Sequence, residues 1–454
     1  MTKIHINLFD IAYIRTRLSQ YVTLKDALAC ILVNKSWFED FIPTIWHTID
    51  FEAHPQFVNL NMSVVTKHGR HIRIIENLNT IAALEAIQNA SVSKLVSLSM
   101  VLDPCLHYQA CCYDILRRNN ASLKNISFSS LYEMEMYLFV DALSPSASTN
   151  ASSRLSHLGL SGVTMTRDAF SSLLRMSPAL VKLRISKTTL SPVSGAELYQ
   201  HPKMVYLSAS INQVFMVSNQ SPGSPSLLAH FPNLKTWSAF NPTISDITPQ
   251  VMKAEISQCC PLLNTMYSNL TPELFADLIT DCFKNLKCIC FMCDIISPTL
   301  TMAILAHIDT IDTILTYEPS PGFYESDDIH SVNKQLGQHG WAVQIMLQLC
   351  SRLKIVKIPL LEMNMGDIEK AEWSCTKLAF LYIRIHGLDT EEMVNRAIQL
   401  WVDGRNRKSQ ECNSHQLSAI SQDNLPLEER VARHLLKFKE LKEVWLGTYI
   451  RQVA

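Results

Sequence analysis

A six-residue apolar pattern recurs along most of the chain. An aliphatic residue is followed by two other residues, a second apolar residue, one further residue and a third apolar residue, as in 95–100 and 123–128. Copies begin at Leu95, Leu123, Leu155, Leu180, Leu234, Leu263, Leu286, Leu353, Leu378 and Leu441, with weaker copies at Met204 and Ile311. Most neighbouring copies lie about 23 to 32 residues apart. Recurrence at such a period is typical of solenoids, in which stacked units share one continuous core.

Helical stretches precede many of these copies. Apolar periodicity predicts helices over 169–178 and 274–283. Proline stands two positions before the first aliphatic residue in several copies, as at Pro178, Pro232 and Pro261, where it ends a helix and favours an extended chain. Each unit is therefore expected to be one helix and one short parallel strand. We expect residues 91–454 to form an α/β solenoid.

The predicted strands present a regular outer face. Their second and third apolar positions point into the core, so the residues between them point outward. Because each unit contacts only its neighbours, this face is long and open, and it can hold an elongated partner. We expect partner contacts from five side chains, namely Lys182, Arg184, Lys235, Tyr382 and Arg384.

Two polar, turn-rich segments interrupt the pattern. They lie near 318–340 and 403–428, in the longest gaps between copies. Such composition predicts solvated insertions. The second also contains Arg405 and Arg407–Lys408, so a nuclear-import or partner-binding segment is the alternative there.

The first fifty residues show helical rather than strand periodicity. Thr23 followed by Asp26 has the form of a capping box and predicts the start of a second helix after 11–18. A third helical stretch covers 35–46, although Pro43 argues against a single unbroken helix. Three helices of this size bury too little surface to be stable alone. We expect them to pack on something else.

The same segment resembles the F-box family. Ile11–Ile14 with Leu18–Val22 is similar to the family's opening, Leu24–Leu28 to its central element, Val33–Trp37 to its lysine–tryptophan signature, and Trp46–Phe51 to its exit. The match covers about forty residues, and it departs from the family at Ala12, where a proline is usual. The repeats resemble leucine-rich repeats in layout more than in exact motif, because Asn or Cys seldom follows the predicted strand.

The resemblance implies an F-box protein with leucine-rich repeats. Residues 5–52 would be an all-helical F-box, 53–90 linker or cap helices, and 91–454 the repeats. Such a chain is a non-catalytic substrate receptor of an SCF-type ubiquitin ligase, which binds a Skp-type adaptor and an unknown protein substrate. The adaptor contacts implied by the resemblance are Ile11, Ile14, Leu18, Leu24, Leu28, Ile31, Leu32, Val33, Lys35 and Trp37. Two alternatives are a leucine-rich-repeat scaffold without a ligase role and a hydrolase or transferase on an irregular α/β domain.

Composition and charge narrow the partners. Apolar residues are 47% of the 454 residues and charged residues only 18%, which favours a chain with much internal surface. Lys plus Arg (40) nearly balance Asp plus Glu (41), so no electrostatic footprint for nucleic acid or an anionic membrane is expected. No apolar run reaches the ~18 residues that a membrane span needs. Without a predicted signal peptide, the 13 cysteines are expected to be reduced thiols of a cytoplasmic or nuclear protein.

Motifs for catalysis or metal binding are weak. With 12 glycines, the sequence contains no phosphate-binding loop. Ser91–Lys94 matches a Ser-x-x-Lys motif but lacks that enzyme class's partner motifs. Cys288, Cys290 and Cys293 lack the second ligand pair of a structural zinc site, so Cys288 and Cys290 are expected to be small buried residues of the repeat core. We expect no catalytic residue, metal or cofactor.

Overall fold

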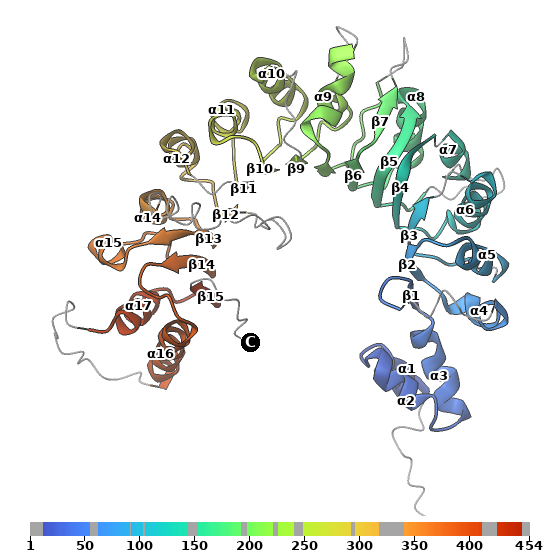
Figure 1. The fold of residues 1–454 in the computed structure, drawn as a ribbon, viewed down its shortest axis with the longest axis horizontal. Helices are drawn as coiled ribbons and strands as arrows, with labels where there is room; N and C mark the ends of the chain where they lie inside the picture. The colour runs from blue at the N-terminus through green and yellow to red at the C-terminus, as the bar shows by residue number, and fades with distance from the viewer. Residues whose placement is uncertain are drawn as a thin grey trace, which may run out of the picture. The chain divides into compact units, whose positions relative to one another are not determined.

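The computed structural model describes residues 12–54, 62–90, 92–102, 105–135, 137–143, 153–191, 198–220, 226–239, 248–291, 296–316, 340–410 and 425–446. The chain forms two compact units, Met1–Asn233 and Leu234–Ala454. The division falls inside the range expected to be one solenoid. Each unit is an α/β structure in which helices and strands alternate along the chain, and in each the helices line one side of the sheet (Figure 1).

Unit 1 begins with three helices and continues as a parallel sheet. Its strand order is β1-β2-β3-β4-β5-β6-β8, and β7 pairs with β5. Its elements are α1 (Ala12–Leu18), α2 (Leu24–Cys30), α3 (Lys35–Ile45), β1 (Thr48–Asp50), α4 (Met62–His68), η3 (Gly69–His71), β2 (Ile74–Leu78), α5 (Ile81–Asn89), β3 (Ser97–Leu102), α6 (Leu106–Asn119), β4 (Asn125–Glu135), α7 (Tyr137–Leu143), β5 (His157–Thr166), α8 (Arg167–Met176), β6 (Lys182–Ser186), β7 (Thr189–Ser191), β8 (Tyr206–Ser208), α9 (Ile211–Gln220) and η4 (Leu227–His230).

Unit 2 repeats the same alternation. Its strands are parallel in the order β9-β10-β11-β12-β13-β14-β15. Its elements are β9 (Thr236–Ala239), α10 (Pro249–Cys259), β10 (Thr265–Ser268), α11 (Pro272–Cys282), β11 (Cys288–Phe291), α12 (Pro298–Leu305), β12 (Thr313–Thr316), α14 (Gly340–Leu349), β13 (Ile355–Met363), α15 (Met365–Lys370), β14 (Phe380–Ile385), α16 (Glu391–Gln410), α17 (Leu427–Leu435) and β15 (Glu443–Leu446).

The apolar pattern locates the strands. In every predicted copy, a strand begins two residues after the first aliphatic residue, as in Leu95 with β3 and Leu353 with β13. The first and second apolar residues of each copy are at most 3% exposed. The first apolar residues of successive copies stack on one another, as do the second, and together they form a continuous core in each unit. This arrangement is compatible with a solenoid-like repeat.

A main-chain ladder joins neighbouring repeats. The carbonyl of Lys235 accepts hydrogen bonds from the N–H groups of Asn264 and Thr265, both at 3.0 Å, and the carbonyl of Lys354 accepts from Ala379 and Phe380 at 2.8 and 3.0 Å. The carbonyls that accept two such bonds belong to His47, Arg73, Val96, Lys124, Ser156, Val181, Lys235, Asn264, Lys287, Asp312, Lys354 and Ala379. Each lies directly after the first apolar residue of a repeat, so backbone groups join neighbouring turns at every step. Side chains add to some of these turns, as where the Ser156 hydroxyl also donates to the Lys124 carbonyl.

The repeat begins earlier in the chain than the apolar pattern predicts. The ladder starts at His47, and β1 pairs in parallel with β2, which pairs with β3. The expectation that 5–52 is all-helical is therefore wrong at its C-terminal end, and 53–90 contains strand β2 as well as helices. The second repeat is irregular because Asn77 has a left-handed backbone (φ 56°) where the register with β3 shifts.

Local signals set the helix ends. The predicted helices over 169–178 and 274–283 are confirmed as α8 and α11. In unit 2, α10, α11 and α12 each begin with proline after a Thr or Ser whose hydroxyl accepts a backbone N–H. This pairing satisfies an end donor and presets the first helical φ. The helices α8 and α10 end two residues before Pro178 and Pro261, as expected.

The predicted insertions lie largely outside the described residues. These residues end at 316 and resume at 340 around the first insertion. At the second insertion, α16 continues to Gln410, and the description resumes at 425. Within the described ranges, no helix has the length and apolar character needed to cross a membrane.

Candidate partner-binding surfaces

The three N-terminal helices are held together by a buried ion pair. Arg15 of α1 is 5% exposed, and its Nε lies 2.5 Å from an Oδ2 atom of Asp40 on α3. The same guanidinium donates to the Ser36 hydroxyl at 2.5 Å. Ala27 of α2 and Phe41 of α3 fill the small core. A charge pair rather than a large apolar core therefore fixes α1 against α3.

Two caps begin the second and third helices. The Thr23 hydroxyl accepts from the Asp26 N–H at 3.2 Å, which confirms the predicted helix start. The Asn34 side chain accepts from the Trp37 N–H at 3.0 Å. The predicted break at Pro43 is wrong, because α3 continues to Ile45. Pro43 has no N–H and so removes one helical hydrogen bond, and the helix ends two residues after it.

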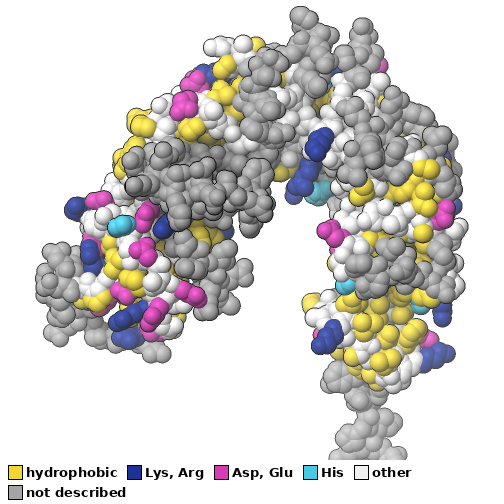
Figure 2. Space-filling view, in the orientation of Figure 1, with side chains coloured by type: hydrophobic (Ala, Val, Ile, Leu, Met, Phe, Trp, Pro, Cys, Tyr) yellow, Lys and Arg dark blue, Asp and Glu magenta, His cyan; other side chains and the backbone are white. Residues whose placement is uncertain are grey.

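A ridge of exposed apolar side chains runs over α2 and the turn that follows it. The N-terminal ridge consists of Leu24, Leu28, Leu32 and Val33, whose exposed fractions are 40%, 46%, 83% and 60%. Tyr21, before α2, is also exposed. Hydrophobic side chains gather over α1–α3 in Figure 2. Large exposed apolar patches mark interaction sites in soluble proteins.

The remaining expected adaptor contacts lie around this ridge. Ile14, Leu18 and Ile31 are half-buried, and Lys35 is exposed. Trp37 is also half-buried and stacks on Phe41, with ring centroids 5.3 Å apart. Ile11 lies outside the described residues. The expected set therefore divides into an exposed ridge and a partly buried base.

The expected partner contacts of unit 1 lie side by side on β6. Lys182 and Arg184 are both exposed. The Lys182 Nζ lies 6.0 Å from the centroid of the Tyr206 ring on β8. Arg184 pairs with Gly159 of β5. Because Gly159 has no side chain, it does not cover Arg184.

The outer strand face of unit 2 carries a mixed aromatic and charged cluster. Lys357 Nζ lies 4.3 Å from the ring centroid of Tyr382 and 5.7 Å from that of Phe380. The Tyr382 ring lies 5.9 Å from Trp445, and its hydroxyl donates to Glu443. Arg384, the other expected contact on β14, has its Nε 3.9 Å from Glu362.

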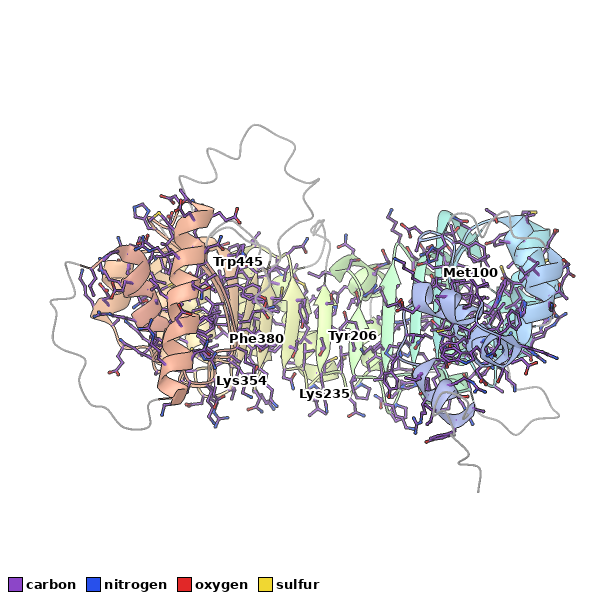
Figure 3. The ribbon with its side chains drawn as sticks, turned by 90° about the horizontal axis from the view of Figure 1, so that it is seen from below. Met100, Tyr206, Lys235, Lys354, Phe380 and Trp445 are labelled. Carbon is purple, nitrogen blue, oxygen red and sulfur yellow. The ribbon has the colours of Figure 1, made fainter. Side chains whose placement is uncertain are left out.

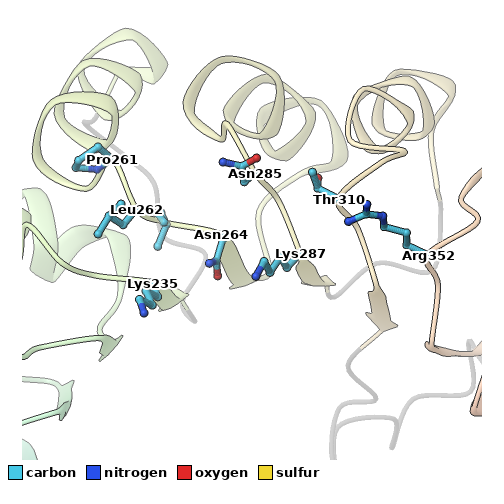
Figure 4. A pocket seen from close by; sticks show the side chains of 9 residues that line it. Lys235, Pro261, Leu262, Asn264, Asn285, Lys287, Thr310 and Arg352 are labelled. Carbon is cyan, nitrogen blue, oxygen red and sulfur yellow. The ribbon is translucent and has the colours of Figure 1, made fainter.

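Lys235 lies apart from this cluster, at the edge where the strands begin. Figure 3 shows Lys235 and Lys354 along that edge, and Phe380 and Trp445 farther along the strand face. Lys235 lines a pocket of about 400 Å³. We call it the basic pocket; its lining residues are Lys235, Pro261, Leu262, Leu263, Asn264, Asn285, Lys287, Thr310 and Arg352 (Figure 4).

Several members of these surfaces were not among the residues predicted from the sequence. Phe380, Trp445 and Lys357 occupy the outward positions of their strands, and Lys287 and Lys354 occupy the same turn position as Lys235. These five residues stand at positions that recur in each copy of the repeat, so an alignment of the copies predicts all five. Arg352 precedes the repeat pattern at Leu353, so no column contains it.

The two thiols of β11 are less acidic than an ordinary cysteine. Burial raises the pKa of Cys288 to about 11 and that of Cys290 to about 12. Cys290 is buried, and Cys288 is half-buried. The expectation of small buried core residues is therefore confirmed for Cys290, which is 4% exposed, and not for Cys288. Cys293 lies outside the described residues, among which no group of three His, Cys, Asp or Glu side chains could hold a metal ion.

A buried histidine is expected to make unit 2 sensitive to acid. His434 packs edge-on against Trp373, with ring centroids 4.6 Å apart, and neither ring nitrogen has a partner in the described part of the chain. Burial, with Lys437 nearby, lowers the pKa of His434 to about 4. Below pH 6.5 the unfolded chain binds a proton that the folded chain does not. The free energy of unfolding is therefore expected to fall by about 2 kcal/mol between pH 7 and pH 5.

Urea unfolding followed by tryptophan fluorescence at the two pH values measures this loss. His434→Phe keeps a ring in the same place and is expected to remove about 2 kcal/mol of the pH dependence. Burial also lowers the pKa of His230 in unit 1 to about 4, so a further pH dependence is expected to remain in that variant. An equal pH dependence in that variant would assign the loss to other groups.

Comparison of the sequence with models of known protein families and with curated proteins gave no match to either. The fold and its exposed surfaces therefore carry the functional assignment. They define an α/β repeat protein with two kinds of candidate binding surface: an apolar ridge on N-terminal helices, and polar or charged patches along the strands.

Proposed function

We propose that this chain is the substrate-recognition subunit of an SCF-type ubiquitin ligase, with α1–α3 as an F-box and the remaining elements as leucine-rich repeats. The F-box would bind a Skp-type adaptor, and the strand side of the repeats would bind a protein substrate. Such a subunit would act in the cytoplasm, the nucleus or both. It would contribute no catalytic group, because holding a target near the ubiquitin-charged enzyme raises its effective concentration there.

One observation carries this proposal: the N-terminal ridge is exposed although the helices beneath it are internally paired. Leu28 and Leu32 are 46% and 83% exposed, while Arg15 donates hydrogen bonds to both Asp40 and Ser36. Leaving such leucines in water forgoes about 25 cal/mol for each Å² that a partner could cover. The resemblance of Leu24–Leu28 and Val33–Trp37 to the F-box supports the adaptor as that partner.

The helices also connect directly to the repeats. Trp46, which ends α3, stacks on His68 with ring centroids 5.0 Å apart and is only 8% exposed. The helices are thus joined to the first repeat through a packed aromatic contact rather than through a long linker. A short rigid connection of this kind suits a receptor that must hold its target at a defined distance.

A binding measurement with a purified Skp-type adaptor tests the proposal. Leu28→Asp with Leu32→Asp is expected to weaken binding by about 2 kcal/mol or more, roughly 30-fold, because it places two charges in an apolar interface. Both side chains are exposed in the free chain, so the thermal unfolding midpoint should not change. Val251→Asp with Met302→Asp is the matched control, since these residues are 41% and 67% exposed on helices of unit 2.

If the wild-type chain does not bind the adaptor, the ligase role is excluded. The alternative, a leucine-rich-repeat scaffold without a ligase role, would then account for the fold. If the adaptor binds but the control pair weakens it as much as the ridge pair does, the ridge is not the contact.

A further inference from the structure

We propose that the basic pocket of unit 2 binds an extended acidic segment of a protein partner. Three cations line the pocket, Lys235, Lys287 and Arg352, and its described lining contains no carboxylate. All three are exposed. None forms an ion pair or a side-chain hydrogen bond with another residue of the described ranges. The whole sequence has a net charge of only −1, so this concentration of positive charge is local.

The fold brings these cations together. Lys235 and Lys287 occupy the same turn position, directly before β9 and β11, and the turn between them contributes Asn264. Neighbouring parallel strands lie ~4.8 Å apart, so the two lysine backbones are separated by about 10 Å. In Figure 4, the Arg352 guanidinium points toward Thr310, on the far side of Lys287 from Lys235.

The spread of charge favours an extended peptide over a single small anion. Lys354 continues the same column before β13, so the cations from Lys235 to Lys354 span four strand spacings, about 19 Å. An extended peptide advances about 3.3 Å per residue and covers that distance with about six residues. Asp312 is the acidic residue of this column, and its carboxylate lies 3.9 Å from Lys354 Nζ and accepts from the Thr313 hydroxyl.

The other lining groups suit a peptide main chain and an aliphatic side chain. Asn264 and Asn285 each offer amide donors and a carbonyl acceptor. Leu262, 49% exposed, and Pro261, also exposed, form an apolar wall beside Lys235. A segment with several Asp or Glu residues and one aliphatic residue would meet both kinds of contact.

This inference names the chemistry of the target and so rests in part on the proposed function, but its test does not involve the adaptor. The probe is a fluorescein-labelled peptide of twelve residues with six Glu, two Leu and four Gly, and the matched peptide has Gln in place of Glu. Fluorescence anisotropy with the full chain is expected to show binding of the Glu peptide that weakens as salt rises from 50 to 300 mM.

Charge reversal locates the site. Lys235→Glu, Lys287→Glu and Arg352→Glu in one variant are expected to weaken binding of the Glu peptide roughly tenfold or more. The control variant carries Lys94→Glu, Arg396→Glu and Arg407→Glu, which are exposed cations elsewhere with the same total charge change. Circular dichroism of both variants checks that the fold is retained. The Leu28→Asp with Leu32→Asp variant should bind the peptide as the wild type does.

Three results would overturn the inference. The first is equal binding of the Gln peptide, and the second is an equal loss in the control variant. The third is no binding of the Glu peptide together with micromolar binding of inorganic pyrophosphate, measured by calorimetry and lost in the charge-reversal variant, which would make the pocket a small-anion site. Loss of adaptor binding with peptide binding intact would instead refute the proposed function alone.

Discussion

Asp40→Leu is expected to unfold the α1–α3 helices while the repeats stay folded. The substitution leaves the Arg15 guanidinium, only 5% exposed, without the carboxylate that lies 2.5 Å from it. Removing one partner of a buried ion pair costs about 3 to 5 kcal/mol. The core of these helices is small, so it cannot offset such a loss. Hydrogen–deuterium exchange of peptides from α1 and α3 measures the effect, with fast exchange there and unchanged protection in β10 and β11.

The double substitution Arg15→Met with Asp40→Leu is the decisive control. Replacing both partners of a buried pair by apolar residues is often neutral or stabilising. The Ser36 hydroxyl, which loses a donor, is exposed and can bond to water. Protection in α1 and α3 should therefore return. If the double variant exchanges as fast as Asp40→Leu, these side chains stabilise the helices through packing and not through the ion pair.

Gly162→Ala is expected to disrupt the pairing of β4 with β5. Gly162 has φ +67°, and an added Cβ would lie 2.1 Å from the carbonyl oxygen of Ser130. The left-handed backbone costs an alanine about 1 kcal/mol, and the clash with a backbone atom adds about 2 kcal/mol, because two paired strands must separate. Exchange of the β4 and β5 amides should become roughly 100-fold faster, as about 3 kcal/mol implies.

Gly387→Ala separates the effect of the left-handed backbone from the effect of the steric clash with Ser130. Gly387 has a similar φ of +87°, but its added Cβ would meet only Leu427 Cδ2, at 3.0 Å. A flexible side chain can move aside, so about 1 kcal/mol is expected around β14. Equal effects of the two substitutions on their own strands would show that backbone conformation, and not the contact with Ser130, determines the cost.

The periodic part of the fold was predictable from the sequence. The column of first apolar residues, such as Leu95 and Leu353, located every predicted strand to the residue, because a short parallel strand with one buried side needs that spacing. The repeats at β1 and β2 were missed for two reasons. Trp46–Phe51 also fits the F-box exit, and Asn77 breaks the spacing of β2 with a left-handed residue.

The candidate sites were only partly predictable. Exposure of the N-terminal ridge depends on which face α2 turns inward, and Ala27 is its buried residue; periodicity alone does not fix that choice. Lys182, Lys235 and Tyr382 were expected to act as one face. The structure places Lys235 at a turn and Tyr382 within a strand. Whether a side chain lies at the turn or on the strand face depends on its position along its strand. That position is known only when the pairing register of neighbouring strands is known.

The ladder of shared carbonyls separates folding from selectivity. Because the carbonyls of Lys235, Asn264 and Lys287 make the joints between repeats, the side chains of Lys235 and Lys287 are not needed for these hydrogen bonds. Substituting these side chains is expected to leave the fold intact and to change only which partner the surface binds. One scaffold of this type can therefore be retargeted by editing a single residue per turn, without redesigning its interior.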